Sequence, residues 1–201
     1  MRIALVVPGG VNRDGEHRVI PALLWLIERL ARRHDVEVIA LRQEVKRDTW
    51  NLFGATVRSV GPRPRGPRAL GLILKLHRQR PFDVFHAIWA DSPGVVALAA
   101  ARLCRRPVLV HIAGGELVSM PDIAFGSARG SWRMLTKLII GSADRVTAAS
   151  GHIIRLAQVG GAEPLRVPLG VGCAPRKKIS GSGRLGGTQW GLPHLSRRST
   201  L

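Results

Sequence analysis

The chain has 201 residues, enough for one domain with a full hydrophobic core and short of the length of two typical domains. Apolar residues make up 45% of it, in short runs separated by charged, Gly or Pro residues, which excludes a chain that is disordered throughout. The formal net charge of +18 points to anionic partners such as a membrane surface or nucleic acid. Nucleic acid is disfavoured, because the basic residues are scattered and lack interleaved aromatic side chains.

The sequence shows no pattern for membrane spanning, export or metal binding. No apolar run reaches the roughly 18 residues of a membrane span, and Met1 and Arg2 lead directly into a strand pattern. We therefore expect a cytoplasmic protein. Cys104 and Cys173 have neither disulfide-framework nor metal-ligand spacing, so both are interpreted as reduced thiols. No cluster of His, Cys and carboxylate residues has ligand spacing, and no metal site is predicted.

Short aliphatic runs alternate with segments of helical periodicity along the chain. The first run, Ile3 to Val7, is typical of a strand buried on both faces of a parallel sheet. Further strands are predicted at residues 36–41, 56–60, 83–89, 107–112, 145–149 and 165–169. Helices are predicted at residues 20–31, 70–77, 92–104, 132–140 and 153–159. Residues 62–67 are expected to form a stiff loop, and Asp91 to cap the helix that follows it.

This alternation predicts the α/β class, with a doubly wound, mostly parallel Rossmann-like sheet that is covered by helices. Ligands of such sheets bind beyond the carboxyl ends of the strands. The loops after Val7, Trp89 and Ile112 are therefore where a site is expected, and all three carry polar or Gly residues.

The loop after the first strand contains Pro8, Gly9 and Gly10, which would let the backbone approach a phosphate group. Asn12 occupies the third glycine slot of the dinucleotide-binding fingerprint, and no Gly-Lys-Ser/Thr phosphate loop exists in the sequence. An NAD enzyme and a P-loop NTPase are therefore disfavoured. A turn that only needs glycine is the alternative interpretation.

Two histidines lie in neighbouring predicted strands. A lone strand histidine is more often structural, and this alternative holds for His86 in particular. His111 comes near the end of its strand, beside the loop of Gly114, Gly115 and Glu116. At that edge an imidazole can donate a hydrogen bond to a sugar hydroxyl or a carbonyl. We expect the His111 ring to face the open end of the sheet.

Seven segments together carry a resemblance to a known family. They are the first strand with its Pro-Gly-Gly loop, "GEH" at the entry to the first helix, "RHDVEVIAL", "FDVFHAIWA", "PVLVHIAGGE", "SADRVTAAS" and "LRVPLGV". In order and spacing they resemble the N-terminal domain of GT-B-fold retaining glycosyltransferases. That large family contains sucrose-phosphate synthases and bacterial lipopolysaccharide and mannosyl transferases. The resemblance covers about residues 1–171.

The resemblance implies the acceptor-side half of an enzyme that transfers a sugar from a nucleotide-sugar donor to a hydroxyl acceptor. It implies no cofactor beyond the donor itself, which a C-terminal domain with a Glu-x7-Glu motif would bind. His111 matches the histidine that contacts the transferred sugar, and His86 matches an acceptor-side position. Gly114, Gly115 and Glu116 are expected to contact substrate. Gly9 with Gly10, or Gly15 with Glu16, matches the loop that approaches the donor phosphates, and the sequence leaves this choice open.

The composition changes near Val171. Residues 172–201 hold 6 basic and no acidic residues, and they are predicted to form a flexible basic tail. A shifted reading frame, a truncated gene or a genuine anchoring tail would each give such a change. On the first two explanations the chain is expected to be inactive alone. The alternative is a non-catalytic binding module for a partner, a glycan or an anionic membrane surface, with the protein peripheral at the inner membrane face.

Overall fold

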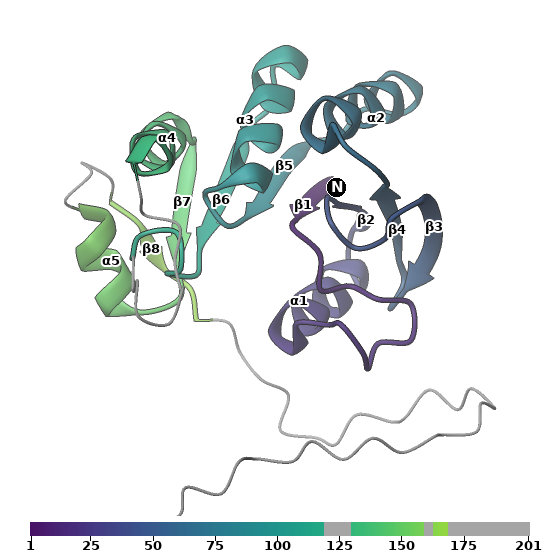
Figure 1. Cartoon of the computed structure of the whole chain (residues 1–201), viewed down its shortest axis with the longest axis horizontal. Helices are drawn as coiled ribbons and strands as arrows, with labels where there is room; N and C mark the ends of the chain where they lie inside the picture. Colours follow the sequence, from purple (N-terminus) through teal and green to yellow (C-terminus); the bar gives the residue numbers. More distant parts are fainter. Residues whose placement is uncertain (119–129, 159–162, 169–201) are drawn as a thin grey trace, which may run out of the picture.

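A computed structural model describes residues 1–118, 130–158 and 163–168 (Figure 1). Within these residues, the strands are β1 (Arg2–Val7), β2 (Asp35–Ala40), β3 (Arg47–Leu52), β4 (Ala55–Val60), β5 (Val84–Ile88), β6 (Val108–Ile112), β7 (Arg145–Ala148) and β8 (Leu165–Arg166). The helices are α1 (Pro21–Ala31), α2 (Arg65–Gln79), α3 (Ser92–Cys104), α4 (Gly130–Ser142) and α5 (Gly151–Gln158). The predicted basic tail lies outside the described residues, as does Cys173.

The strands form one eight-stranded sheet in the order β3-β4-β2-β1-β5-β6-β7-β8. All neighbouring pairs are parallel except β3 and β4, which form an antiparallel hairpin at the edge of the sheet. The predicted α/β fold with a mostly parallel sheet is confirmed. Because β3 was not predicted, the strands that hold His86 and His111 are the fifth and sixth of the chain instead of the fourth and fifth.

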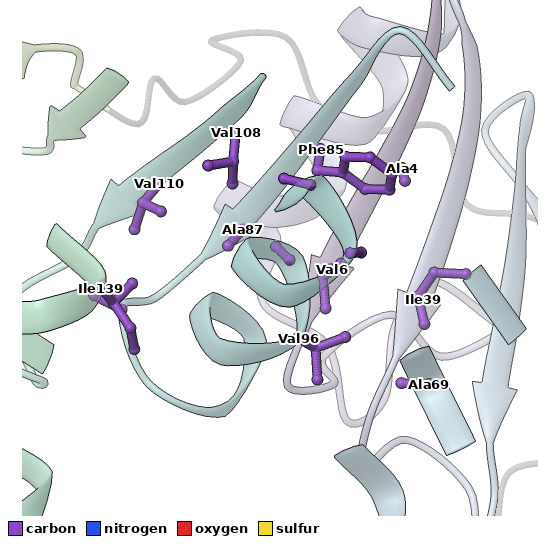
Figure 2. Packing of buried hydrophobic residues seen from close by; sticks show 14 of the residues in the cluster. Ala4, Val6, Ile39, Ala69, Phe85, Ala87, Val96, Val108, Val110 and Ile139 are labelled. Carbon is purple, nitrogen blue, oxygen red and sulfur yellow. The ribbon is translucent and has the colours of Figure 1, made fainter. Parts of the chain in front are cut away.

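Helices cover both faces of the sheet. On one face, α1 packs its buried residues against β1, β2, β3 and β4, with Leu24 and Ile27 fully buried. On the other face, α2, α3, α4 and α5 pack against a larger cluster. Figure 2 shows members of that larger cluster, among them Val6 of β1, Phe85 of β5 and Ile139 of α4. The sheet is therefore doubly wound.

The two directions of winding diverge between β1 and β5. The chain leaves β1 through α1 toward β2, whereas it leaves β5 through α3 toward β6 on the opposite side. The loops after β1 and β5 consequently separate to opposite faces of the sheet at the edge formed by the carboxyl ends of its parallel strands. We call this the carboxyl edge. Such a point of divergence leaves a crevice, where ligands of open α/β sheets bind.

Two local predictions differ from the structure. Helix α2 begins at Arg65, so Pro67 belongs to its first turn and not to the preceding loop. Proline is tolerated there because the first backbone N–H groups of a helix have no partner within the helix. Asp91 lies at the N-cap of α3, but its side chain makes no capping hydrogen bond.

No helix in the described ranges is long and apolar enough to cross a membrane. Cys104 is a free, half-buried thiol at the end of α3. Burial raises the pKa of this thiol, and the nearby arginine charges oppose the shift.

Candidate functional site at the carboxyl edge of the sheet

The loop after β1 folds back on itself at Gly10. This residue has a φ of 80°, in the left-handed region that glycine adopts without strain. Its carbonyl oxygen accepts a hydrogen bond from the backbone N–H of Ile20 at 2.9 Å. A Cβ atom at this position would lie 2.6 Å from the Ile20 side chain, closer than packing allows. The glycine is thus required by the close return of the chain as well as by its φ angle.

The same loop is hydrogen-bonded to the loop after β2 and to β3. The buried side chain of Gln43 accepts a hydrogen bond from the Val11 N–H at 2.9 Å, and Trp50 Nε1 donates to the Val11 carbonyl at 3.2 Å. Gly9 lies against this glutamine side chain. Sequence reasoning missed Gln43, since a single glutamine after a strand carries no pattern of its own.

The second candidate for the glycine loop lies further from the sheet. The backbone N–H of Gly15 donates to the Asn12 carbonyl at 3.1 Å, and that of Glu16 donates to Asp14 Oδ1 at 2.9 Å. The Glu16 side chain is exposed. The structure therefore places Gly9 and Gly10 at the carboxyl end of β1, and Gly15 and Glu16 in an outer turn of the same loop.

Glu116 joins the loops after β5 and β6. Its carboxylate accepts hydrogen bonds from the backbone N–H groups of Ala90 at 3.3 Å, Ala113 at 3.2 Å and Gly114 at 2.8 Å. The residue is only 2% exposed, and burial raises the pKa of its carboxyl group, with these N–H donors opposing the shift. Its oxygens point inward to the backbone. The predicted substrate contact remains a prediction, and the observed contacts are those of a residue that shapes two loops.

Gly114 and Gly115 form the turn between β6 and Glu116 and are partly exposed. Gly114 has a φ of 119°, and a Cβ atom there would lie 3.1 Å from the Ile153 side chain of α5. The turn therefore carries partly exposed backbone at the carboxyl edge, close enough to α5 to disfavour a side chain.

His111 lies one residue before the end of β6, at the carboxyl edge as expected. The residue is only 3% exposed, so its ring is covered at this edge, and whether it faces the open end of the sheet remains a prediction. Strand side chains project perpendicular to the sheet, and Val110 and Ile112 point into the α2–α5 face, so His111 points to the face that α1 covers. Its Nδ1 lies 2.9 Å from the hydroxyl of Thr147 on β7, whereas its Nε2 is buried and has no hydrogen-bond partner among the described residues.

His86 lies on the same face of the neighbouring strand. In the register of β5 and β6, Ile88 is opposite His111 and His86 is opposite Leu109, which makes the two histidines diagonal neighbours. The Nε2 atom of His86 is also buried without a partner in the described part of the chain. Burial, and next the nearby His111, lower the pKa of His86 to about 3. Burial also lowers the pKa of His111, so both rings are neutral at pH 7.

Asp91 completes the site and was interpreted from the sequence only as a helix cap. It follows Trp89, whose φ of 77° is rare for a bulky residue and occurs mostly where function or tight packing imposes it. The Oδ1 atom of Asp91 is buried without a hydrogen-bond partner in the described residues. Burial raises the pKa of its carboxyl group, and the Arg42 charge in the loop after β2 opposes this shift. An orphaned carboxylate oxygen at the carboxyl edge can accept a hydrogen bond from a ligand hydroxyl.

In the described part of the chain, no three His, Cys, Asp or Glu side chains lie together as metal ligands would. The site instead consists of hydrogen-bonding groups: neutral histidines, one half-buried carboxyl group and backbone N–H groups beside glycine. These are groups suited to bind hydroxyl and phosphate oxygens.

Residues 19–170 match the family described as "Glycosyl transferase 4-like domain". The chain belongs to this family. A search of the curated proteins gives no match. The glycosyl transferase 4-like domain is thus identified by a family match that covers most of the chain and by its fold.

Solved structures agree on that fold. Sucrose-phosphate synthase from Thermosynechococcus elongatus superposes with a TM-score of 0.66 at 15% identity, over 83% of this chain and 47% of the synthase. HepE from Anabaena, in complex with UDP, gives 0.57 at 16% identity, over 85% of this chain and 44% of HepE. UDP-N-acetylglucosamine 2-epimerase from Rickettsia bellii superposes with a TM-score of 0.52 at 12% identity, over 83% of this chain and 44% of the epimerase.

The chain therefore spans somewhat less than half the length of each of these proteins. The expected resemblance to the N-terminal domain of GT-B-fold glycosyltransferases is confirmed. The epimerase shows that the same fold also serves a reaction other than glycosyl transfer. The function of this glycosyl transferase 4-like domain must consequently be argued from its site and not from its fold.

Proposed function

We propose that this domain forms the acceptor-side wall of a glycosyltransferase that moves a sugar from a nucleotide-sugar donor to a hydroxyl acceptor. The observation that carries the proposal is the buried, unpartnered Nε2 atom of His111 at the carboxyl edge of the sheet. A buried polar atom without a partner costs free energy, on the order of 1–3 kcal/mol. A ligand oxygen that accepts a hydrogen bond there would remove that cost.

In this proposal, the hydroxyl of Thr147 determines which nitrogen of the His111 ring carries the proton. When its hydroxyl donates to Nδ1 of the neutral ring, the ring proton resides on Nε2. His111 then donates a hydrogen bond to an oxygen of the transferred sugar. The carboxyl group of Asp91, on the neighbouring loop, accepts a hydrogen bond from the acceptor hydroxyl. We assign His86 to support the same face of the sheet beside His111.

The glycine loop and Glu116 have separate parts. Gly9 and Gly10 present backbone without side chains at the end of β1, and we assign the donor phosphates to this loop in preference to Gly15 and Glu16. Glu116 acts as a positioning residue that holds the loops after β5 and β6. Gly114 and Gly115 present the backbone that contacts substrate. Catalysis then consists of positioning the reactants and stabilising the leaving phosphate electrostatically.

The proposal includes a second half for the donor. HepE, which shares the fold, is seen in complex with UDP and is about twice as long as this chain. A site with only one wall lacks the nucleobase pocket and the closure that orients the sugar. We therefore expect the 201-residue chain alone to transfer no sugar.

The test compares two proteins. The chain alone, and the chain joined to the donor-binding half of a related glycosyltransferase, are incubated with labelled nucleotide sugars and a pool of acceptors extracted from a cell lysate. Transfer by the joined protein that is lost in its His111→Ala variant supports the proposal. Transfer by the chain alone, or transfer by the joined protein that His111→Ala does not change, contradicts it.

A second candidate function is peripheral binding to an anionic membrane. Helix α4 exposes three large apolar side chains, Trp132 at 45%, Met134 at 78% and Leu138 at 61%, and it also carries Arg133 and Lys137. A basic residue near an anionic bilayer contributes about 1 kcal/mol of binding. Exposed apolar side chains on the same helix can enter the interface.

Sedimentation with liposomes tests this candidate. We expect the chain to sediment with anionic liposomes at low ionic strength, to be released by salt, and to bind less after Trp132→Ser with Leu138→Ser. The control is Val45→Ser, which removes an exposed apolar side chain from a loop remote in sequence from α4. Equal sedimentation with neutral and anionic liposomes would exclude the membrane function.

A further inference from the structure

A cavity of about 330 Å³ lies between the β3–β4 hairpin and α2, and we call it the β4–α2 cavity. Its lining residues are Arg47, Ser59, Val60, Arg68, Gly71, Leu72 and Lys75. Its volume is at the lower end of the range of small-molecule sites, about 300–1,000 Å³. The cavity lies on the face of the sheet that α2 covers, whereas Val11 of the glycine loop and the two histidines lie on the α1 face.

Three cationic side chains meet at this cavity from two elements. Arg47 begins β3 and is opposite Val60 in the hairpin register, which turns both side chains to the α2 face of the sheet. Arg68 and Lys75 are seven residues apart on α2, about two helical turns, and thus share one face of the helix. The sequence separates these residues, and the fold brings their charges together.

None of the three cations pairs with a carboxylate in the described part of the chain. Helix α2 contains no acidic residue. The acidic side chains nearest in sequence to Arg47 are engaged elsewhere, because Glu44 pairs with Arg18 and Asp48 pairs with Arg13. Arg68 Nη1 donates to the Pro62 carbonyl at 2.8 Å, so the three positive charges have a backbone acceptor but no carboxylate partner among the described residues.

Ser59 lies beside Val60 in β4 and opposite Asp48 in the hairpin, so its side chain turns to the α1 face and it lines the cavity with its backbone. Its side chain is buried, and its Oγ accepts a hydrogen bond from the Glu44 N–H at 3.2 Å. The lining thus offers cations but no carboxylate.

Gly71 lines the cavity without a side chain. It lies in the middle of α2, where glycine costs about 1 kcal/mol relative to alanine. Its φ is not in the left-handed region, and nothing lies within 4 Å of the position that a Cβ atom would occupy. Neither backbone conformation nor close packing requires glycine here, and its place in the lining leaves this part of the cavity free of a side chain.

We propose that the β4–α2 cavity binds a phosphate-bearing ligand, either a phosphomonoester or a diphosphate, which is free or belongs to a lipid headgroup. A single carboxylate would leave most of the positive charge uncompensated, whereas a phosphate group brings two charges and a diphosphate more. Arginine guanidinium groups match phosphate oxygens with two parallel hydrogen bonds each, and lysine adds a point charge. This site does not depend on the proposed glycosyl transfer.

Calorimetric titration of the full chain at low ionic strength tests the proposal. Inorganic pyrophosphate is one probe, and vesicles of phosphatidylglycerol with phosphatidylcholine are the other. The cavity variant is Arg47→Gln with Arg68→Gln. Its matched control is Arg29→Gln with Arg155→Gln, which removes the same charge at two exposed arginines outside the cavity. The variant Gly71→Leu fills the cavity without changing any charge.

We expect the cavity variant and Gly71→Leu each to raise the Kd for pyrophosphate by on the order of tenfold or more, while the control stays close to the unmodified chain. If only vesicle binding responds in this way, the phosphate belongs to a lipid headgroup. Three results would overturn the proposal: no saturable binding of either probe, an equal loss in the cavity variant and the control, or unchanged binding of both probes by Gly71→Leu.

Discussion

The carboxylate of Glu116, in the loop after β6, accepts a hydrogen bond from the backbone N–H of Ala90, in the loop after β5, at 3.3 Å. The same carboxylate also accepts from Ala113 and Gly114. Glu116→Ala leaves three N–H groups without this acceptor, and we expect the free energy of unfolding to fall by about 3 kcal/mol. Glu116→Gln keeps one oxygen acceptor and should cost about 1 kcal/mol.

Urea unfolding followed by circular dichroism measures both changes. Glu116→Asp is a useful third variant, because it keeps the charge while its shorter side chain cannot reach all three donors. Equal stability of the Ala and Gln variants would show that the three hydrogen bonds do not hold the loops together.

Gly10 and Gly71 are predicted to respond to alanine in opposite directions. In Gly10→Ala the new Cβ lies too close to the Ile20 side chain, and the alanine must adopt a φ of 80°. We therefore expect the free energy of unfolding to fall by about 1–3 kcal/mol. In Gly71→Ala the Cβ meets nothing within 4 Å, and higher helix propensity should add up to about 1 kcal/mol. Thermal unfolding of the two variants decides this. A Gly10→Ala protein as stable as the unmodified chain would show that the β1 loop can relax around the side chain.

The buried histidines make stability dependent on pH. The pKa of His86 is lowered from 6.5 to about 3 in the folded chain, so the unfolded chain binds more protons between these values. Stability from this group is therefore fully present above pH 6.5 and is lost as pH falls toward 3. The slope for one such proton is at most about 1.4 kcal/mol per pH unit. His111 acts in the same direction, because its pKa is also lowered.

Comparison of the chain with its His86→Leu variant isolates this effect. Asp91 and Glu116 have raised carboxyl pKa values, so they act in the opposite direction in both proteins and cancel in the difference. We expect the variant to lose less stability than the unmodified chain between pH 6.5 and pH 4. Parallel stability curves of the two proteins would mean that His86 takes up its proton in the folded state as readily as in the unfolded one.

The buried parallel strands were predictable from sequence, whereas the edge strand β3 was not. Strand β1 is buried at every position and reads as one aliphatic run. In β3, by contrast, only Trp50 and Leu52 are buried, and the other residues are polar. An edge strand with one solvated face gives a weak pattern of six residues, and its pairing with β4 depends on a Phe53–Gly54 turn in the left-handed region.

Part of the candidate site was likewise predictable from sequence, and part was not. The sequence places His111, Gly9 and Gly10 at the carboxyl edge, since that placement follows from strand order alone. It could not reveal that Thr147 engages the His111 ring, because that contact spans 36 residues and depends on the β6–β7 register. The orphaned oxygen of Asp91 likewise emerges only when burial and hydrogen bonds are known.

The last prediction concerns His111 and Thr147 in the protein in which this domain is joined to a donor-binding half. His111→Ala should lower turnover by about ten- to a thousand-fold, comparable to the loss of one positioned hydrogen-bond donor. Thr147→Val removes the hydroxyl 2.9 Å from Nδ1, so the ring proton is no longer directed to Nε2. We expect kcat to fall by about tenfold with little change in KM, because a positioning residue acts on the transition state through the ring.

Thr147→Ser separates positioning from packing. Serine keeps the hydroxyl and loses the methyl group, so it should restore most of kcat if the hydrogen bond matters. Loss of the hydroxyl in Thr147→Val is expected to shift the acid limb of the kcat–pH profile, because the His111 ring then lacks its hydrogen-bond partner. Thr147→Ser should return that limb to its original position. If Ser and Val variants lose the same activity, the methyl group supports the sheet and Thr147 has no part in directing the proton to Nε2.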